Sequence, residues 1–341
     1  MKTIDSVEEL EEQLSRPVPA DSAAIASLGG DLLILGAGGK MGPSLARLAR
    51  RAADEAGSNT RILAASRFPD DQLRRQLEGH GIETIACDLL EPGALAKLPS
   101  VENVIFMAAR KFGTTGSENL TWAMNTLLPG LVAERYRDSR IVAFSTGNVY
   151  PLTPTHAGGA LESDAVSPQG EYAQSALGRE RMFEYGSHRW GTPVTILRLN
   201  YAVELRYGVL RDIATAVFER RPLDLRMGFV NVIWQGDANS ICLRSFSHCQ
   251  SPPLILNLTG LETLSVRKIC EEFGRRFGIV PTFEGEESDT ALLSNAGRAH
   301  QLFGSPRVSV DQVIAWVAKW VERGGAALNK PTHFQTRDGK F

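Results

Sequence analysis

The sequence Leu32-Leu33-Ile34-Leu35-Gly36-Ala37-Gly38-Gly39-Lys40-Met41-Gly42 joins a short apolar run to a glycine-rich turn. A short apolar run that ends in glycines is typical of a buried strand. Residues 43–56 follow, with Leu45, Leu48 and Ala49 on one face and arginines on the other, which predicts a helix. The segment therefore predicts a strand, a tight turn and a helix in succession.

Three glycines of the turn, Gly36, Gly39 and Gly42, are spaced three residues apart. In a dinucleotide-binding turn the first glycine permits the bend, the second lets the backbone approach the pyrophosphate, and the third lets helix and strand pack closely. The phosphates then rest against unpaired N–H groups at the positive end of the helix. The predicted phosphate-binding residues are Gly36, Gly38, Gly39, Lys40, Met41 and Gly42. The alternative is a glycine turn without a ligand.

Strands and helices continue to alternate along the first 200 residues. Strands are predicted at 61–65, 82–87, 104–108, 140–144 and 194–199, and helices at 73–78, 120–135 and 171–185. This alternation predicts an α/β fold with a doubly wound (Rossmann-type) parallel sheet. Further helices are expected at 266–277 and 310–321.

The chain of 341 residues is too long for one compact core, so two lobes are expected. We expect a smaller C-terminal α/β substrate lobe beside the nucleotide-binding lobe. The predicted divisions are an N-terminal helical extension at 1–29, the dinucleotide-binding domain at 30–200, the mixed substrate lobe at 201–325 and a polar tail at 326–341. Within the extension, the spacing of Val7, Leu10 and Leu14 predicts a short amphipathic helix that serves as a packing arm.

Composition narrows the class of protein. The net charge of −2 provides no basic field for nucleic acid or an anionic membrane. The four cysteines form no CxxC pair, so we expect reduced thiols and no metal site. The N-terminus lacks the apolar core of a signal peptide, and no run of about 18 apolar residues is present. We therefore expect a cytoplasmic protein that contacts neither nucleic acid nor membrane.

The end of the second predicted strand bears on the choice of cofactor. An acidic residue there would bind the ribose 2′-hydroxyl of NAD, but this chain has Ser66 and Arg67. A guanidinium suits a phosphate, and Lys40 adds a second positive charge, so NADP is favoured and NAD remains possible. Two solvated surface cations are the alternative. Asp88, after the third strand, would hold the adenine amine or cap the next helix.

At this point the chain resembles the extended short-chain dehydrogenase/reductase family, the NAD-dependent epimerase/dehydratase group, over about residues 30–322. The residues that carry the resemblance are the glycine turn, Cys87-Asp88-Leu89, Ala108-Ala109, Asn125, Ser145-Thr146-Gly147-Asn148-Val149-Tyr150-Pro151, Glu171-Tyr172, Phe229-Val230-Asn231-Val232 with Asp237, and Leu256-Asn257-Leu258-Thr259-Gly260. The resemblance implies that the last of these is a strand of the substrate lobe.

The resemblance also implies functional roles. Thr146 would hydrogen-bond the reacting hydroxyl or carbonyl, and Tyr172 would exchange a proton with it while hydride moves to or from the nicotinamide. The cofactor-binding residues implied beyond the turn are Ser66, Arg67, Asp88, Leu89, Ala108, Ala109, Asn125 and Tyr172. A homodimer formed through helices 120–135 and 172–185 is implied as well.

One departure from the family pattern stands out. The family places a lysine four residues after the tyrosine, on the same helix face, and this chain has Ala176 there. A phenol titrates near pH 10, so it needs nearby positive charge to act as a base at neutral pH. Lys111, just after the fourth strand and beside Arg110, is the candidate substitute. Alternatively, the oxidised nicotinamide supplies the charge or Tyr172 acts only as a neutral donor; or redox chemistry has been lost.

Two functions follow from these observations. The first is an NAD(P)-dependent oxidoreductase, epimerase or dehydratase that acts on a sugar, sugar acid or nucleotide sugar by hydride transfer. The second is a non-catalytic dinucleotide-binding sensor or interaction protein, which the missing lysine favours. For an anionic substrate, Arg198, Arg206 and Arg211 are candidate contacts.

Overall fold

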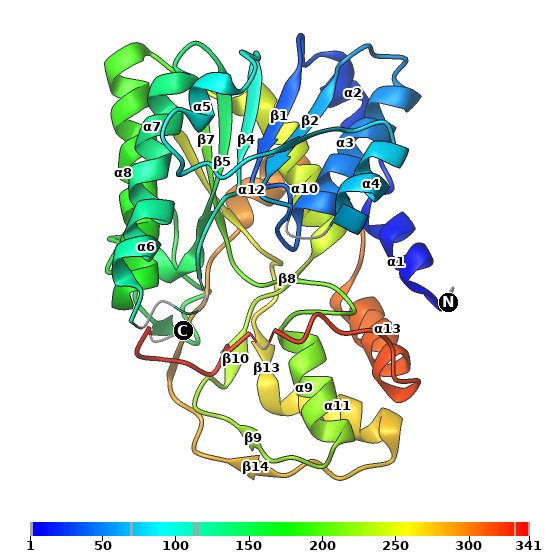
Figure 1. Ribbon diagram of the computed structural model, residues 1–341. Helices are drawn as coiled ribbons and strands as arrows, with labels where there is room; N and C mark the ends of the chain where they lie inside the picture. The colour runs from blue at the N-terminus through cyan, green and yellow to red at the C-terminus, as the bar shows by residue number, and fades with distance from the viewer. Residues whose placement is uncertain (1–2, 69–70, 112, 114–115, 331, 340–341) are drawn as a thin grey trace.

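The computed structural model describes residues 3–68, 71–111, 113, 116–330 and 332–339. Its centre is a seven-stranded sheet in the order β12-β7-β5-β4-β1-β2-β3, and every neighbouring pair in it is parallel (Figure 1). The strands are β1 Leu32–Leu35, β2 Ile62–Ser66, β3 Glu83–Ala86, β4 Asn103–Phe106, β5 Arg140–Thr146, β7 Val194–Leu199 and β12 Leu254–Leu258.

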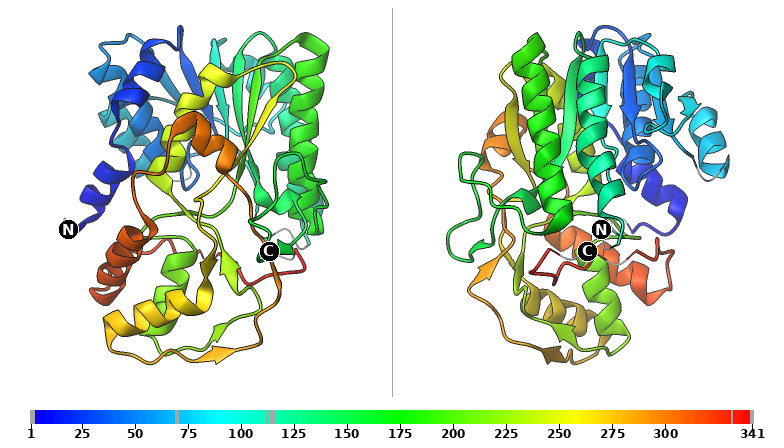
Figure 2. Two further views of the ribbon diagram at one scale, coloured as in Figure 1. Left: turned by 180° about the vertical axis from the view of Figure 1, so that it is seen from behind. Right: turned by 60° about the vertical axis from the view of Figure 1, so that its left-hand side comes forward.

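Helices cover both faces of this sheet, as the two views of Figure 2 show. Because side chains alternate along a strand, Leu32 and Ile34 of β1 join one buried cluster and Leu33 and Leu35 join another. The first cluster includes residues of α2 Pro19–Ala26, α3 Gly42–Glu55 and α10 Gln235–Arg244, and the second includes residues of α5 Ala94–Lys97, α7 Leu128–Arg135 and α8 Gly170–Trp190. The predicted doubly wound Rossmann-type sheet is confirmed.

Most predicted helices are present with shifted ends. The helix predicted at 120–135 consists of α6 Glu118–Trp122, a π-helical segment Ala123–Leu127 and α7 in unbroken succession. The helix predicted at 73–78 is α4 Asp71–Gly79. Helix α2 was not predicted, because Pro19 reads as a stop after the first helix although proline also fits the first turn of a new one.

One predicted strand lies in the other lobe. Residues 256–260 were expected in the substrate lobe, but β12 pairs in parallel with β7 and forms the edge of the main sheet. Helix α10 also packs on this lobe, against α2 and α3, and α12 Gly297–Phe303 packs against β12. The chain therefore returns to the nucleotide-binding lobe after residue 200. This return covers the edge of β7, whose backbone N–H and C=O groups would otherwise be unpaired.

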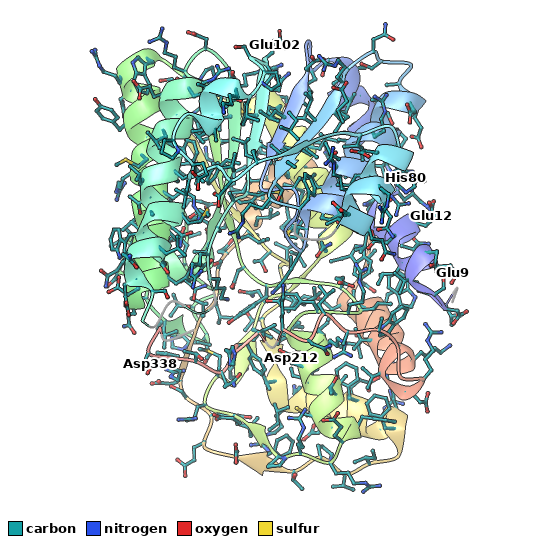
Figure 3. The ribbon with its side chains drawn as sticks, in the orientation of Figure 1. Glu9, Glu12, His80, Glu102, Asp212 and Asp338 are labelled. Atoms are coloured by element: carbon teal, nitrogen blue, oxygen red, sulfur yellow. The ribbon has the colours of Figure 1, made fainter. Side chains whose placement is uncertain are left out.

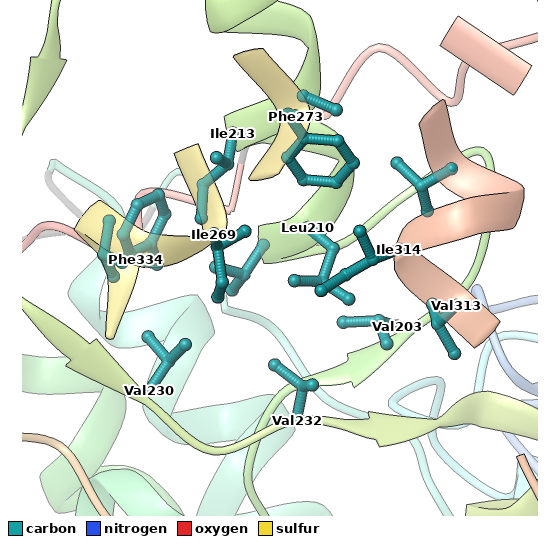
Figure 4. Close-up of a cluster of buried hydrophobic side chains, with 14 of the residues drawn as sticks. Val203, Leu210, Ile213, Val230, Val232, Ile269, Phe273, Val313, Ile314 and Phe334 are labelled. Atoms are coloured by element: carbon teal, nitrogen blue, oxygen red, sulfur yellow. The ribbon is translucent and has the colours of Figure 1, made fainter. Parts of the chain in front are cut away.

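The smaller lobe is built around α9 Val209–Phe218, α11 Val266–Phe277 and α13 Val310–Glu322, whose apolar faces share one buried cluster (Figure 4). Its strands have two residues each. They pair as β8 Ala202–Val203 with β11 Ile233–Trp234, β9 Leu223–Asp224 with β14 Phe283–Glu284, and β10 Phe229–Val230 with β13 Leu264–Ser265. A fourth pair, β6 Thr153–Pro154 with β15 Thr290–Ala291, tethers the loop before α8.

The N-terminal extension packs between the lobes. Leu10 and Leu14 of α1 Val7–Leu14 are fully buried in the cluster of the smaller lobe. On the polar face, Glu11 pairs with Arg206 of the smaller lobe at 2.7 Å, and Glu12 pairs with Arg51 of α3 at 2.8 Å. The predicted amphipathic helix thus contacts both lobes.

The C-terminal tail crosses from α13 to the start of α8 (Figure 1). Phe334 is buried in the cluster drawn in Figure 4. The backbone N–H and hydroxyl of Thr332 donate to Asp212 of α9, at 2.8 and 2.6 Å, and Figure 3 labels Asp212 below the tail. Phe341, a second possible anchor, lies outside the described residues.

Candidate active site

A cleft of about 1440 Å³ lies where the two lobes meet. Its wall on the sheet side is formed by the glycine turn and by the residues that follow β4 and β5. The start of α8, the start of α9 and the tail also line the cleft. Ligands of doubly wound sheets bind at the carboxyl ends of the strands, where the strand order reverses, and here that point lies between β1 and β4.

The outer glycines of the turn are required by the protein itself. Gly36 has a φ of +92°, and a Cβ added there would lie 2.6 Å from the backbone nitrogen of Ala108. A Cβ on Gly42 would lie 2.2 Å from the carbonyl oxygen of Ala37. These contacts bring β1, β4 and α3 close together, as expected for the first and third glycines.

The middle glycine has a different environment. A Cβ on Gly39 would meet nothing nearer than the carbonyl oxygen of Gly36 at 3.4 Å, and Gly39 lines the cleft. Met41 precedes α3 without providing a side-chain acceptor, and the first turn of α3 holds no acidic residue. The helix N–H groups therefore face a space that a side chain at residue 39 would fill. This arrangement fits the pyrophosphate of a dinucleotide.

The residues at the end of β2 lie beside the turn. A Cβ on Gly38 would come within 2.5 Å of the hydroxyl of Ser66, so Gly38 allows the turn to approach β2. Arg67 is 68% exposed and lies 4.0 Å from Asp88, a distance at which the pair is weak. Asp88 also accepts a hydrogen bond from the backbone N–H of Leu90 at 3.0 Å, so it stabilises the turn that it begins.

The segment after β4 is held by a buried amide. Asn125 accepts from the backbone N–H of Arg110 at 2.8 Å and donates to its carbonyl oxygen at 2.9 Å. It also donates to Ser175 and accepts from Arg179, both at 3.0 Å. Both N–H groups and both oxygen lone pairs are thus used within the protein. Asn125 positions Arg110, and no group of this side chain is left for the predicted cofactor contact.

Two alanines and a leucine complete the predicted cofactor set. Ala108 packs against Gly36, and Ala109 lines the cleft. Leu89 is buried in the cluster beneath the sheet. Small side chains after β4 keep the floor of the cleft open beside the glycine turn.

Thr146 and Tyr172 come together at the opposite end of the cleft. Thr146 ends β5, Tyr172 lies in the first turn of α8, and a hydrogen bond joins the two side chains. Both line the cleft. Burial raises the pKa of Tyr172, and the positive charge of Arg179 and the bond with Thr146 oppose the rise. The structure therefore brings the predicted catalytic pair together.

Ala176 lies one turn after Tyr172 and is fully buried. The ammonium of Lys111 lies over the ring of Tyr172, 5.6 Å from its centre. Burial lowers the pKa of Lys111 to about 8. Lys111 is therefore near the tyrosine, as predicted, but its charge depends on pH close to neutrality.

Lys40 contacts different residues from Arg67. Its ammonium lies 3.2 Å from the centre of the Tyr207 ring, on the smaller lobe. Burial, together with the positive charges of Lys111 and Lys330, lowers the pKa of Lys40 to about 7, and the carboxylates of Asp212 and Glu204 oppose the shift. The three lysines line one cleft, which favours an anionic ligand there.

Sequence reasoning missed Arg179, which is 2% exposed and lines the cleft. It lies seven residues after Tyr172, a spacing that returns to the same helix face and that would have identified it. Of the arginines predicted to bind substrate, Arg198 instead forms a buried ion pair with Glu180 at 2.7 Å. Arg206 pairs with Glu204 at 3.0 Å and with Glu11. Both charges are therefore balanced within the protein.

Comparison with known proteins decides the family. The model of the NAD dependent epimerase/dehydratase family matches residues 32–203, which include the glycine turn, Thr146 and Tyr172. The chain belongs to this family. Membership confirms the resemblance seen in the sequence and makes the chain an NAD-dependent, epimerase-like enzyme.

Solved structures with the same fold cover most of the chain. Pal from Bacillus thuringiensis matches with 16% sequence identity and a TM-score of 0.71. UDP-glucuronic acid 4-epimerase from Bacillus cereus, in complex with NAD, matches with 17% sequence identity and a TM-score of 0.72. UDP-glucose 4-epimerase from Thermus thermophilus, in complex with NAD, matches with 17% sequence identity and a TM-score of 0.70. Each match covers 86–87% of this chain and 99% of the other. At this identity the likeness establishes the fold.

Three kinds of feature were not found: a curated relative and, among the residues that the structure describes, a metal-binding cluster and a membrane-spanning helix. No curated protein matches the sequence. In the described part of the chain, no cluster of three or more His, Cys, Asp or Glu is arranged to hold a metal ion. None of the helices built from those residues has the length and apolar character needed to cross a membrane.

Proposed function

We propose that this protein is an NAD(P)-dependent epimerase or dehydratase that acts on a sugar hydroxyl or ketone. One observation carries the proposal. Thr146 and Tyr172, joined by a hydrogen bond, line the same cleft as the open middle glycine of the phosphate-binding turn. A dinucleotide whose pyrophosphate rests on that turn extends toward the pair.

Each of these residues has its own role in binding or proton transfer. Gly36, Gly39 and Gly42 hold the pyrophosphate against the N–H groups of α3. A bound nicotinamide would accept or return hydride. Thr146 orients the substrate hydroxyl, and Tyr172 accepts its proton as the carbonyl forms.

The positive charges that line the cleft indicate the class of substrate. Lys40, Lys111 and Lys330 line the cleft, and after burial the charges of Lys111 and Lys330 are the next causes that lower the pKa of Lys40. A diphosphate or carboxylate would relieve this repulsion. We therefore infer a nucleotide sugar or sugar acid as substrate, a class that includes the UDP-glucose and UDP-glucuronic acid bound in related structures.

The activity is tested by incubating the protein with NAD⁺ or NADP⁺ and a panel of UDP sugars and sugar acids. Epimerisation or dehydration is detected by NMR of the sugar, and net oxidation by the absorbance of reduced nicotinamide. Tight cofactor binding with no turnover across the panel would contradict the enzyme and favour the dinucleotide-binding sensor, the second candidate.

We also infer a preference for NADP over NAD from Arg67, because β2 ends in Ser66 without an acidic residue to bind a ribose hydroxyl. Arg67→Ala should weaken NADP binding by about ten-fold, as expected for the loss of a charge-assisted hydrogen bond, and leave NAD binding unchanged. Calorimetry with both nucleotides measures the two affinities. Arg75→Ala, at an exposed position of α4, is the matched control. An equal effect of Arg67→Ala on both nucleotides refutes the preference.

A homodimer through α6, α7 and α8 is part of the proposal. Large apolar side chains are exposed along these helices and the π-helical segment between α6 and α7: Leu120, Trp122, Leu127, Leu131 and Tyr185. Water-exposed apolar rows of this kind are typical of an interface between subunits.

Leu127→Asp should convert the dimer to a monomer, because Leu127 is 57% exposed within this apolar row and a buried carboxylate is costly. Light scattering measures the mass. Leu261→Asp, at a leucine that is 56% exposed on the other lobe, is the control and should leave the mass unchanged. A wild-type protein of monomeric mass would refute the dimer.

A further inference from the structure

The position of the family's lysine is filled by Ala176, so the charge that activates Tyr172 must come from elsewhere. Positions 172, 176 and 179 lie on one face of α8, one turn apart. Long side chains on a helix point back toward its N-terminus. Arg179 therefore reaches toward the turn that carries Tyr172, past the small side chain of Ala176.

Hydrogen bonds hold the guanidinium of Arg179 in this place. One terminal nitrogen donates to the carbonyl oxygen of Phe144 at 2.8 Å, and the other donates to Asn125 at 3.0 Å. Phe144 lies on β5, two residues before Thr146. The guanidinium is thus fixed between the strand that provides Thr146 and the helix that provides Tyr172.

The charge of Arg179 is not balanced by an ion pair with any carboxylate of the described residues. Both of its acceptors are neutral oxygens, and its buried Nε has no hydrogen-bond partner in the same part of the chain. The neighbouring Glu180 binds Arg198 at 2.7 Å and also accepts from Ser145, so that pair is already neutral. Burial lowers the pKa of Arg179, whereas an ionised Tyr172 and the neighbouring Glu180 raise it, so a nearby anion stabilises this buried cation. The phenolate of Tyr172 is such an anion.

Lys111 is the competing candidate, and its chemistry differs. Its pKa is lowered to about 8, so part of its population is neutral in the pH range in which an enzyme of this class works. Burial lowers the pKa of Arg179 as well, but a guanidinium starts from a far higher pKa and keeps its proton throughout that range. Arg179 thus provides a permanent charge, whereas Lys111 provides a variable one.

We propose that Arg179 is a positioning residue that replaces the family's lysine by stabilising the phenolate of Tyr172. In the step that it serves, the phenolate takes the proton of the substrate hydroxyl, so the substrate O–H bond breaks and the tyrosine O–H bond forms. The C–H bond of the same carbon breaks as its C=O bond forms, and a bound nicotinamide nucleotide would accept the hydride. This role rests on the proposed function, but the ionisation of Tyr172 can be measured without substrate or cofactor.

The test is a spectroscopic titration of Tyr172. Tyrosinate absorbance is recorded against pH for the wild type and for each variant. The curve of the corresponding protein that also carries Tyr172→Phe is then subtracted, which leaves the titration of Tyr172. Arg179→Gln should raise the pKa of Tyr172 by roughly one or more pH units, as expected for loss of an opposite charge close by. Ala176→Lys in the Arg179→Gln protein should lower it again, because it restores the family's cation.

Matched variants separate charge from structure. Lys111→Gln should move the pKa of Tyr172 less than Arg179→Gln does. If Arg179→Gln does not fold, Arg179→Lys replaces it and should raise the pKa by a smaller amount, since a buried ammonium loses its proton more easily than a guanidinium. An unchanged pKa in a folded Arg179 variant, or a larger shift with Lys111→Gln, would overturn the proposal.

A second readout is the pH profile of turnover. The rising limb, which reports the ionisation of the base, should move to higher pH in Arg179→Gln and return in the double variant with Ala176→Lys. A uniform loss of rate with no movement of the limb would mean that Arg179 is only structural. Absence of turnover in the wild type would refute the proposed function, and the titration would still decide the role of Arg179.

Discussion

Tyr172→Phe should lower the rate of hydride transfer by about 10²–10⁴-fold, the usual contribution of a positioned acid or base. The substitution removes one hydroxyl and keeps the ring, which is buried in the first turn of α8 beneath the ammonium of Lys111. Without the phenol, no group in this place accepts the substrate's proton. Single-turnover measurements of reduced nicotinamide give the rate.

The control for this loss is cofactor binding. Because the glycine turn is formed by other elements, the affinity for the nicotinamide nucleotide should fall far less than the rate, although Tyr172 is also an implied cofactor contact. Thr146→Val, which removes the partner of Tyr172, should lower the rate as well, by a smaller factor because Tyr172 remains. Full activity in Tyr172→Phe would disprove the role that we give to the tyrosine.

Gly39→Asp should weaken binding of the nicotinamide nucleotide by roughly 100-fold or more, since like charges brought together cost several kcal/mol. The added side chain would enter the space in front of α3, where a Cβ meets no protein atom nearer than 3.4 Å. For the same reason the protein itself should fold normally. Calorimetry measures the affinity, and thermal unfolding without ligand measures the stability.

Two variants bracket this effect. Gly79→Asp adds the same charge at an exposed glycine of α4 and should leave binding unchanged. Gly42→Ala should instead destabilise the protein, because its Cβ would lie 2.2 Å from the carbonyl oxygen of Ala37. Normal affinity in Gly39→Asp would mean that no pyrophosphate rests on this turn, and the hydride chemistry would lose its basis.

Several features of the site could be predicted from the sequence, either from local spacing, from the family resemblance or from the order of the strands. The glycine turn is visible from the spacing of Gly36, Gly39 and Gly42, and the pairing of Thr146 with Tyr172 follows from the family resemblance. Lys111 was placed near the tyrosine from the order of the strands, and it lies over the ring. The assignment of residues 256–260 failed because strand pairing is made with a distant segment, β7.

By itself, the sequence determined the alternation of strands and helices in the first 200 residues, the position of the glycine turn and the alanine at position 176. Those properties depend on the spacing of nearby residues, which can be read directly in the amino-acid sequence. Only the tertiary structure decided which cations lie near Tyr172 and which arginines are already neutralised. Arg179 and Arg198 look alike in sequence, yet one contacts neutral oxygens and the other pairs with Glu180. The charge available to a buried group depends on every element packed around it, and that environment exists only after folding.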